Sequence, residues 1–241
     1  MQTEQEVREQ LAACYRLVHQ HGWTDLVYTH ISARIPGPEE HFLLNPLGFM
    51  FNEVTASNLV KIDLDGNIVG RSPHSVNKAG FVIHSAVHAA RPDVQCVIHL
   101  HTHAGMAISM MKCGLLPLSQ HAQMFYGRVS YHGYEGIAID LDERTRLQRD
   151  LGANPVMILR NHGTLVAAAT IPLAFSLMFH LEKACQAQLA AMSTGQELEL
   201  PPEEASVKTR ELAFRADSPI GRAEWPALMR FLDRTDPSYK Q

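Results

Sequence analysis

A run of alternating apolar residues and histidines at residues 97–103 is the segment best suited to chemistry. Strand side chains alternate between the two faces of a sheet, so His99 and His101 would share one face while Ile98 and Leu100 take the other. Two imidazoles placed in this way can bind a metal ion, and the alternative is a pair of hydrogen-bonded histidines at a sheet edge. Metal binding therefore depends on finding a third ligand.

A second apolar run supplies a candidate for that ligand. Residues 155–160 have the composition of a short buried strand and lead into residues 161–163, Asn-His-Gly, whose glycine suits a sharp turn. Three neutral imidazoles would leave open coordination positions on a divalent ion, as a catalytic site needs. The predicted metal ligands are therefore His99, His101 and His162.

Other histidines are interpreted differently. His84 and His88 are spaced as in a zinc-protease helix, but Ser85 stands where that motif needs a glutamate, so a structural role is favoured. His103 could add a further imidazole to the strand face or cap the helix that follows. Capping is favoured because the strand should already be ending there.

Composition limits the classes of protein that the chain can represent. With 241 residues and 46% hydrophobic content, it can build one sizeable core. A net charge of −4 without a Lys/Arg cluster argues against nucleic acid and acidic membranes as partners. The absence of a signal-peptide pattern and of closely paired cysteines predicts a reduced, cytoplasmic protein.

Turn and cap signals predict an alternating α/β domain. Strands are expected at 31–35, 42–44 and 94–101, a hairpin at 62–68, and helices from a Thr3-x-x-Glu6 capping box to Gly22, at 81–90, at 104–113, from Asp140 to Gly152 and from about Thr170 to Gly195. Residues 1–200 are expected to form the main domain. After the prolines at 201 and 202, residues 201–241 would add a helical appendage to that domain.

Several segments together resemble one family, the class II aldolases and adducins, and its adducin-like branch in particular. The likeness covers roughly residues 5–195 and is carried by residues 23–32, 41–48, 53–57, 90–93, 99–101, 114–119, 131–136 and 161–163. It implies a three-layer α/β/α sandwich with a mostly antiparallel central sheet. It also implies a divalent metal ion on His99, His101 and His162, with zinc expected first and manganese, cobalt or iron(II) as alternatives. The implied assembly is a homotetramer with the active site at the subunit interface.

The chain departs from the family's sugar-phosphate aldolases where those enzymes hold phosphate. They use a Gly-Asn-x-Ser turn, a Ser/Thr-Gly pair and a Ser-Ser pair, and the matching segments here are 29–32, 47–48 and 78–79. Leu47 in such a cradle would leave phosphate oxygens unsatisfied, which predicts an unphosphorylated substrate. His30, Ser32 and Lys78 are the predicted substrate-binding residues, and His30 and Lys78 could meet a carboxylate.

Two more departures concern proton transfer. Gly80 stands where the aldolases place the glutamate that acts as base, and this glycine is typical of the adducin-like branch. His121 is the approximate counterpart of a tyrosine that the aldolases borrow from a neighbouring subunit as a proton donor. Because an imidazole can donate a proton near neutral pH, the resemblance makes His121 the predicted catalytic residue.

These observations predict a metal-dependent lyase, of decarboxylase or retro-aldol type, for a small unphosphorylated hydroxy- or keto-carboxylate. Decarboxylation suits Gly80 best, because loss of carbon dioxide creates the carbanion without a base. Two alternatives stay open: a non-haem iron oxygenase that uses the same three histidines, and a non-catalytic, adducin-like interaction module.

Overall fold

One mixed sheet organises the computed structural model, which describes residues 2–137 and 142–241. Within that part of the chain the strand order is β3-β2-β1-β4-β7-β6-β5. Neighbouring strands pair antiparallel except β5 and β6, which are parallel, so the predicted mostly antiparallel sheet is confirmed. The strands are β1 (His30–Arg34), β2 (Phe42–Leu44), β3 (Val60–Ile62), β4 (Cys96–Leu100), β5 (Val129–His132), β6 (Val156–Leu159) and β7 (Gly163–Ala168).

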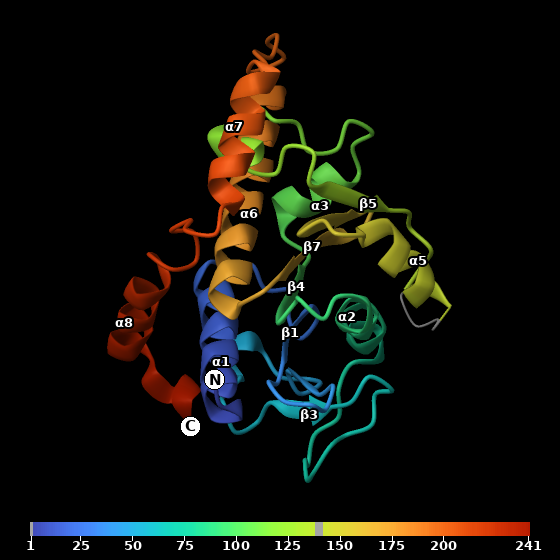
Figure 1. Ribbon diagram of the computed structural model, residues 1–241, viewed down its shortest axis with the longest axis vertical. Coiled ribbons are helices and arrows are strands. Elements are labelled where there is room, and N and C mark those ends of the chain that lie inside the picture. Colours follow the sequence, from blue (N-terminus) through green and yellow to red (C-terminus); the bar gives the residue numbers. More distant parts are fainter. Residues whose placement is uncertain (1, 138–141) are drawn as a thin grey trace.

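Helices cover both faces of this sheet, which gives the expected three layers (Figure 1). The first and sixth helices lie on one side, and the second and fifth lie on the other. The helices are α1 (Glu4–Gln20), α2 (Lys78–Ala90), α3 (His103–Ser109), α4 (Gln120–Gln123), α5 (Glu143–Leu151), α6 (Ile171–Ser193), α7 (Glu203–Phe214) and α8 (Trp225–Thr235), with short 3-10 turns η1 (Phe51–Glu53) and η2 (Pro237–Lys240).

The central strand β4 alternates between the two layers as its sequence predicts. Ile98 and Leu100 are buried in the core that includes α1 and α6. Val97 is buried in the second core, between the sheet and helices α2 and α5. Because side chains two residues apart share a face, His99 lies on the α2 side of the sheet. The apolar alternation of β4 therefore decides which layer holds the histidines.

Strand β7 is an element that the sequence did not predict. It follows His162 directly and pairs with both β4 and β6, so His162 lies in a tight connection between two neighbouring strands. The left-handed backbone of this turn is at Asn161, with φ +55°, and not at Gly163. A side chain at Gly163 would collide with the carbonyl oxygen of Leu100. Gly163 is therefore needed for close packing of the strands. The expectation that it serves the sharp turn was wrong.

Helix boundaries largely follow the cap signals. The Thr3 hydroxyl accepts a hydrogen bond from the Glu6 amide at 3.2 Å, and the Glu6 carboxylate accepts one from the Thr3 amide at 2.7 Å. Thr102, and not His103, caps α3, because its hydroxyl accepts from the Gly105 amide. The predicted start at Asp140 lies outside the described residues. The hairpin expected at 62–68 is reduced to one bridge between its ends.

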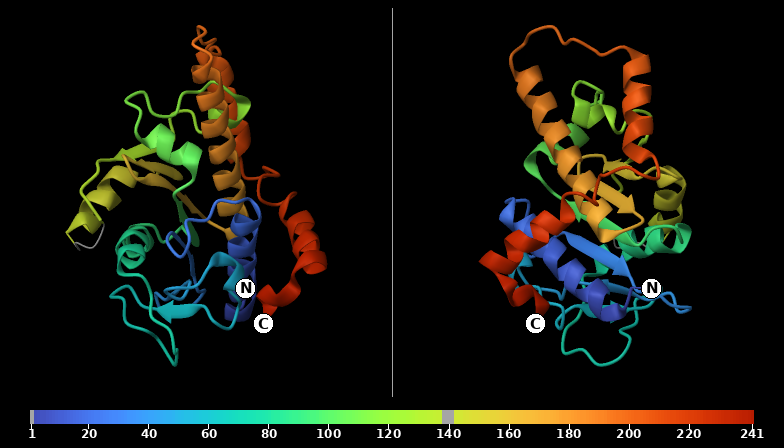
Figure 2. Two further views of the ribbon diagram at one scale, coloured as in Figure 1. Left: turned by 180° about the vertical axis from the view of Figure 1, so that it is seen from behind. Right: turned by 60° about the vertical axis from the view of Figure 1, so that its left-hand side comes forward.

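The C-terminal helices return to the body of the molecule. Helix α7 projects at the top and contacts α4, which in turn contacts α6, while α8 and η2 lie against α1 (Figure 2). Arg16 of α1 forms an ion pair with Asp236 at 2.6 Å. No helix among the described residues is both long and apolar enough to cross a membrane.

Candidate metal centre

Five chain segments meet at one edge of the sheet and enclose a cavity of about 530 Å³. Strand β1 starts there, and its antiparallel neighbour β4 ends there. The β6–β7 turn, the segment after β5 and the first turn of α2 complete the walls. His30, Lys78, His99, His101 and His162 all line this cavity. The topology therefore brings together residues that are far apart in the sequence.

The three predicted metal ligands converge in this cavity. One nitrogen from each of His99, His101 and His162 lies within 4.8 Å of the others. The Nε2 atoms of His99 and His101 are 3.1 Å apart. Nitrogens that share one metal ion at about 2.1 Å each are separated by roughly 3 to 4 Å. The donor set and its spacing fit a divalent ion that keeps open positions for substrate.

Polar partners at the Nδ1 atoms of two of these imidazoles orient the rings, so that their Nε2 atoms face the cluster. The Nδ1 atom of His99 donates to the carbonyl oxygen of Thr164 at 3.1 Å, which leaves Nε2 with a free lone pair. The Nδ1 atom of His101 lies 2.9 Å from a carboxylate oxygen of Asp25. Sequence reasoning missed Asp25, because only the folded chain places residue 25 beside residue 101. A carboxylate in this position makes the imidazole a better ligand.

Burial favours the neutral form of two of the three histidines. It lowers the pKa of His99 well below the ordinary value, with smaller contributions from His162 and His101. Burial likewise lowers the pKa of His162 to about 4. Neutral imidazoles are the form that binds metal, so these two residues are ready to act as ligands at neutral pH.

His30 fills the space beside Gly80. A Cβ atom built on Gly80 would lie only 2.6 to 2.8 Å from three atoms of the His30 ring. That ring stacks over His99 with centroids 6.3 Å apart, and burial lowers its pKa to about 3. Neither ring nitrogen has a hydrogen-bond partner among the described residues. The imidazole of His30 therefore occupies the place where a glutamate side chain at position 80 would begin.

Of the other two predicted substrate-binding residues, one lines the cavity and one does not. Lys78 is exposed at the cavity wall. Ser32 is fully buried and does not line the cavity, and its hydroxyl lies 2.6 Å from Nδ1 of His84 and 2.7 Å from Nε2 of His88. The structure thus gives Ser32, His84 and His88 a shared place between β1 and α2, behind His30.

His121 is not brought to the three metal histidines within one chain. It lies on α4, with its ring 5.2 Å from the ring of His180 on α6, and it does not line the cavity. The neighbouring segment 115–118 is half-buried. A direct role for His121 at the metal centre would therefore need a second copy of the chain.

Thr29 is a cavity residue that sequence reasoning did not single out by itself. Its φ is +66°, a left-handed conformation that a β-branched residue rarely adopts. Its side chain is fully buried, and the hydroxyl has no partner among the described residues. Strain of this kind is concentrated at functional sites.

The model of the class II aldolase and adducin N-terminal domain matches residues 9–189. The chain belongs to this family. An aldolase II superfamily protein from Pseudomonas syringae is 52% identical, with a TM-score of 0.95 over 100% of this chain and 97% of that one. L-fuculose 1-phosphate aldolase from Glaciozyma antarctica is 30% identical, with a TM-score of 0.87 over 99% and 93% of the two chains. The expected class II aldolase fold is thereby confirmed.

The family also links the chain to a protein that is not named as an enzyme. Alpha-adducin of Rattus norvegicus is 43% identical over 245 residues, which cover 95% of this chain but 33% of alpha-adducin. The chain thus corresponds to about one third of that relative. Family membership supports a class II aldolase type of site but leaves the reaction to be argued from the residues.

Proposed function

We propose that the protein is a metal-dependent lyase that acts on a small, unphosphorylated hydroxy- or keto-carboxylate. The observation that carries the proposal is the convergence of three imidazoles, those of His99, His101 and His162, on one open cavity. A divalent ion held there, zinc in the first instance, would supply a Lewis acid and a template for substrate oxygens.

The residues around the ligands support a carboxylate substrate. Lys78 offers a positive charge at the cavity wall, and His30 offers ring nitrogens that have no partner among the described residues. Leu47, by contrast, is 48% exposed and does not line the cavity. The cavity wall therefore offers donors for one carboxylate, whereas the leucine expected to disrupt a phosphate cradle lies outside that wall.

Decarboxylation is the favoured reaction within this class. Proton abstraction from carbon would need a base at position 80, where the glycine leaves room only for the ring of His30. Loss of carbon dioxide leaves its electron pair on carbon and requires only a later proton donor. We assign that donation to His121 of a neighbouring subunit, because His121 lies outside the cavity of its own chain. The proposal thus includes a homotetramer with its active sites at subunit boundaries.

The resemblance to alpha-adducin supports a second candidate, a non-catalytic interaction module. Such a module would not need imidazole nitrogens that are spaced for a metal ion and held in orientation by partners at Nδ1. Metal content therefore separates the two candidates.

The test begins with elemental analysis of untagged protein after gentle purification. The lyase proposal predicts a tightly held divalent ion at the three histidines, lost in each of the variants H99A, H101A and H162A and retained in H103A, which changes an exposed histidine nearby. Decarboxylation, retro-aldol cleavage and oxygen consumption are then screened with the metal found. Full metal content in all three ligand variants would refute the assignment, and oxygen consumption coupled to turnover would favour the oxygenase.

A further inference from the structure

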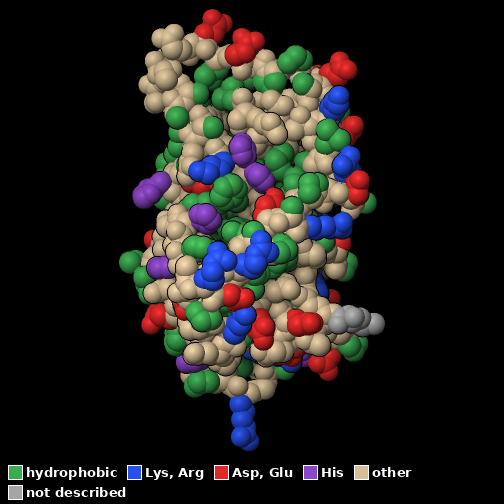
Figure 3. All heavy atoms as spheres, turned by 90° about the vertical axis from the view of Figure 1, so that its left-hand side faces the viewer, with side chains coloured by type: hydrophobic (Ala, Val, Ile, Leu, Met, Phe, Trp, Pro, Cys, Tyr) green, Lys and Arg blue, Asp and Glu red, His purple; other side chains and the backbone are tan. Residues whose placement is uncertain are grey.

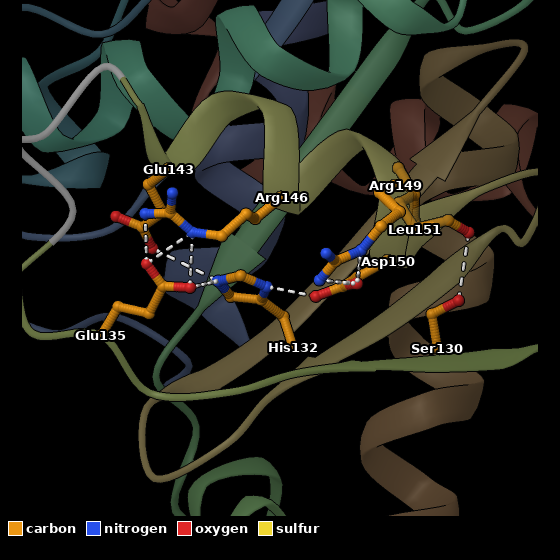
Figure 4. Close-up of polar contacts among 8 residues, drawn as sticks. All are labelled: Ser130, His132, Glu135, Glu143, Arg146, Arg149, Asp150 and Leu151. Atoms are coloured by element: carbon orange, nitrogen blue, oxygen red, sulfur yellow. Dashed lines mark hydrogen bonds and ion pairs between the residues drawn. The ribbon is translucent and has the colours of Figure 1, made fainter.

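Outside the three-histidine centre, His132 at the end of β5 lies among three carboxylates (Figure 4). On one side its Nδ1 atom is 2.7 Å from Oδ2 of Asp150. On the other side Nε2 faces Oε1 of Glu143 at 3.5 Å and Oε1 of Glu135 at 3.9 Å. His132 and Glu143 are buried, whereas Glu135 is exposed. The imidazole is therefore held by one carboxylate and directed at two others.

The nitrogen that faces the two glutamates lacks a hydrogen-bond partner. His132 is only 3% exposed, and Nε2 is a buried polar atom without such a partner among the described residues. A buried polar atom left without a hydrogen-bond partner is unfavourable, so a ligand that occupied this position would stabilise the site. The distances to Glu143 and Glu135 exceed those of hydrogen bonds but match the separations between atoms that share one metal ion.

A small void accompanies these three groups. It measures about 10 Å³ and is lined by His132, Glu135 and Glu143 together with residues of the main cavity wall. This volume is close to the least that a single water-sized sphere requires. One nitrogen and two carboxylate oxygens, all within 4.8 Å of one another, surround it.

Charged groups of both signs surround the void. Arg146 pairs with both oxygens of Glu135, Arg149 pairs with Asp150, and Arg160 also lines the void. The first two arginines hold the outer carboxylates in place. The pair formed by Asp150 and the Nδ1 atom of His132 has the arrangement that orients a metal-binding imidazole.

We propose that Nε2 of His132 and the carboxylates of Glu143 and Glu135 form a second divalent-cation site, suited to zinc or manganese. A nitrogen ligand with two carboxylate oxygens fits these ions, and water would complete the coordination. The site is separate from the three-histidine centre and does not depend on the proposed function of that centre.

The second site adjoins the first through a shared wall. Tyr134, Gly136 and His162 line both the small void and the main cavity. A cation on Glu135 would fix the segment 133–136 between β5 and the cavity. We therefore assign to this cation the positioning of a cavity wall, without contact to the reacting atoms.

The experiment counts ions on the full chain. Protein stripped with a chelator is dialysed against Zn²⁺ alone or Mn²⁺ alone, and bound metal is measured by elemental analysis. Two ions per chain are expected for the wild type, and one each for H132N, E143Q and H99A. Hydrogen exchange in H99A should slow across residues 133–136 when the metal is added, which places the remaining ion at the second site.

A matched control separates this site from ordinary surface pairs. His41 also lies near a carboxylate, Glu39, at 3.2 Å, but no second carboxylate faces its ring in the described part of the chain. H41N should therefore keep both ions. One ion in the wild type that H99A abolishes, or two ions retained in both H132N and the nearly isosteric E143Q, would overturn the proposal. Circular dichroism of each variant verifies that the fold is intact.

Discussion

At the scale of single residues, His30 and Gly80 act as one unit. The histidine ring takes the volume that any side chain at position 80 would enter, so neither residue can be interpreted alone. A larger side chain at position 80 would need the ring of His30 to move, so a carboxylate cannot be introduced there by a single change without overpacking.

Replacing Gly80 by glutamate tests this coupling. G80E should destabilise the fold by about 1 to 3 kcal/mol through overpacking against His30, and fuculose phosphate cleavage should stay at background. The double variant H30G/G80E should recover much of the stability, because it vacates the ring's volume. Unfolding by urea measures both effects. Robust cleavage of a sugar phosphate by the native protein would instead show that it is a sugar-phosphate aldolase.

Thr29 offers a second test at this scale. Its φ of +66° is unfavourable for threonine and ordinary for glycine, so T29G should keep or raise stability, by up to about 1 kcal/mol. The same change should impair turnover, because Thr29 lines the cavity. T170G is the control: Thr170 has φ −148° and caps α6, so its replacement should lower stability. A clear loss of stability in T29G would show that the Thr29 side chain stabilises the fold by more than its left-handed backbone destabilises it.

At the scale of elements, the contact of Ser32 on β1 with His84 and His88 on α2 makes stability depend on pH. Burial lowers the pKa of His84 well below its ordinary value and that of His88 to about 3. Below about pH 6.5 the unfolded chain therefore binds more protons than the folded one, so the stability that is fully present above this pH is lost on acidification.

The pH effect can be assigned by a difference measurement. Between pH 7.5 and pH 5, H88Q should lose about 2 kcal/mol less stability than the wild type, because one buried group no longer titrates. H103Q removes an exposed histidine and should follow the wild-type curve. Parallel curves for H88Q and the wild type would mean that His88 already binds a proton in the folded state.

Local sequence signals predicted the elements that carry their own periodicity. The period of two placed His99 and His101 on one face because that rule needs no tertiary information. Asp25 and strand β7 were missed, since the first acts on a residue 76 positions away and the second follows a turn whose left-handed residue is an asparagine. Gly163 was noticed for its turn, whereas its real constraint comes from Leu100, which is adjacent only after folding.

At the scale of the whole molecule, one side of the protein mixes both signs of charge. In Figure 3 Lys and Arg are interspersed with Asp and Glu, and histidines gather in the upper half of that face. A subunit contact is the association that the proposed function requires, because His121 lies outside its own chain's cavity.

Mixing two inactive variants tests that contact. H99A lacks a metal ligand and H121A lacks the proposed donor, so each should be inactive or slow as a homo-oligomer. Random hybrids formed from equal amounts should regain up to about a quarter of wild-type activity, because some sites then combine intact ligands with an intact neighbour. Light scattering verifies the tetramer. No complementation in verified hybrids, or full activity of H121A, would remove His121 from the mechanism.

The pairing of β1, β4 and β7 has a kinetic consequence. His30 pairs with His99, 69 residues away, and Leu100 pairs with Thr164, 64 residues away. Contacts of such high contact order form slowly, because the chain must close long loops before the pairing stabilises them. His99 lies on β4, His101 follows the end of β4 and His162 lies in the turn before β7, so the three histidines come together only once these strands have paired. Under the proposed function we therefore expect the chain to fold first, at a rate independent of metal concentration, and to bind its ion afterwards.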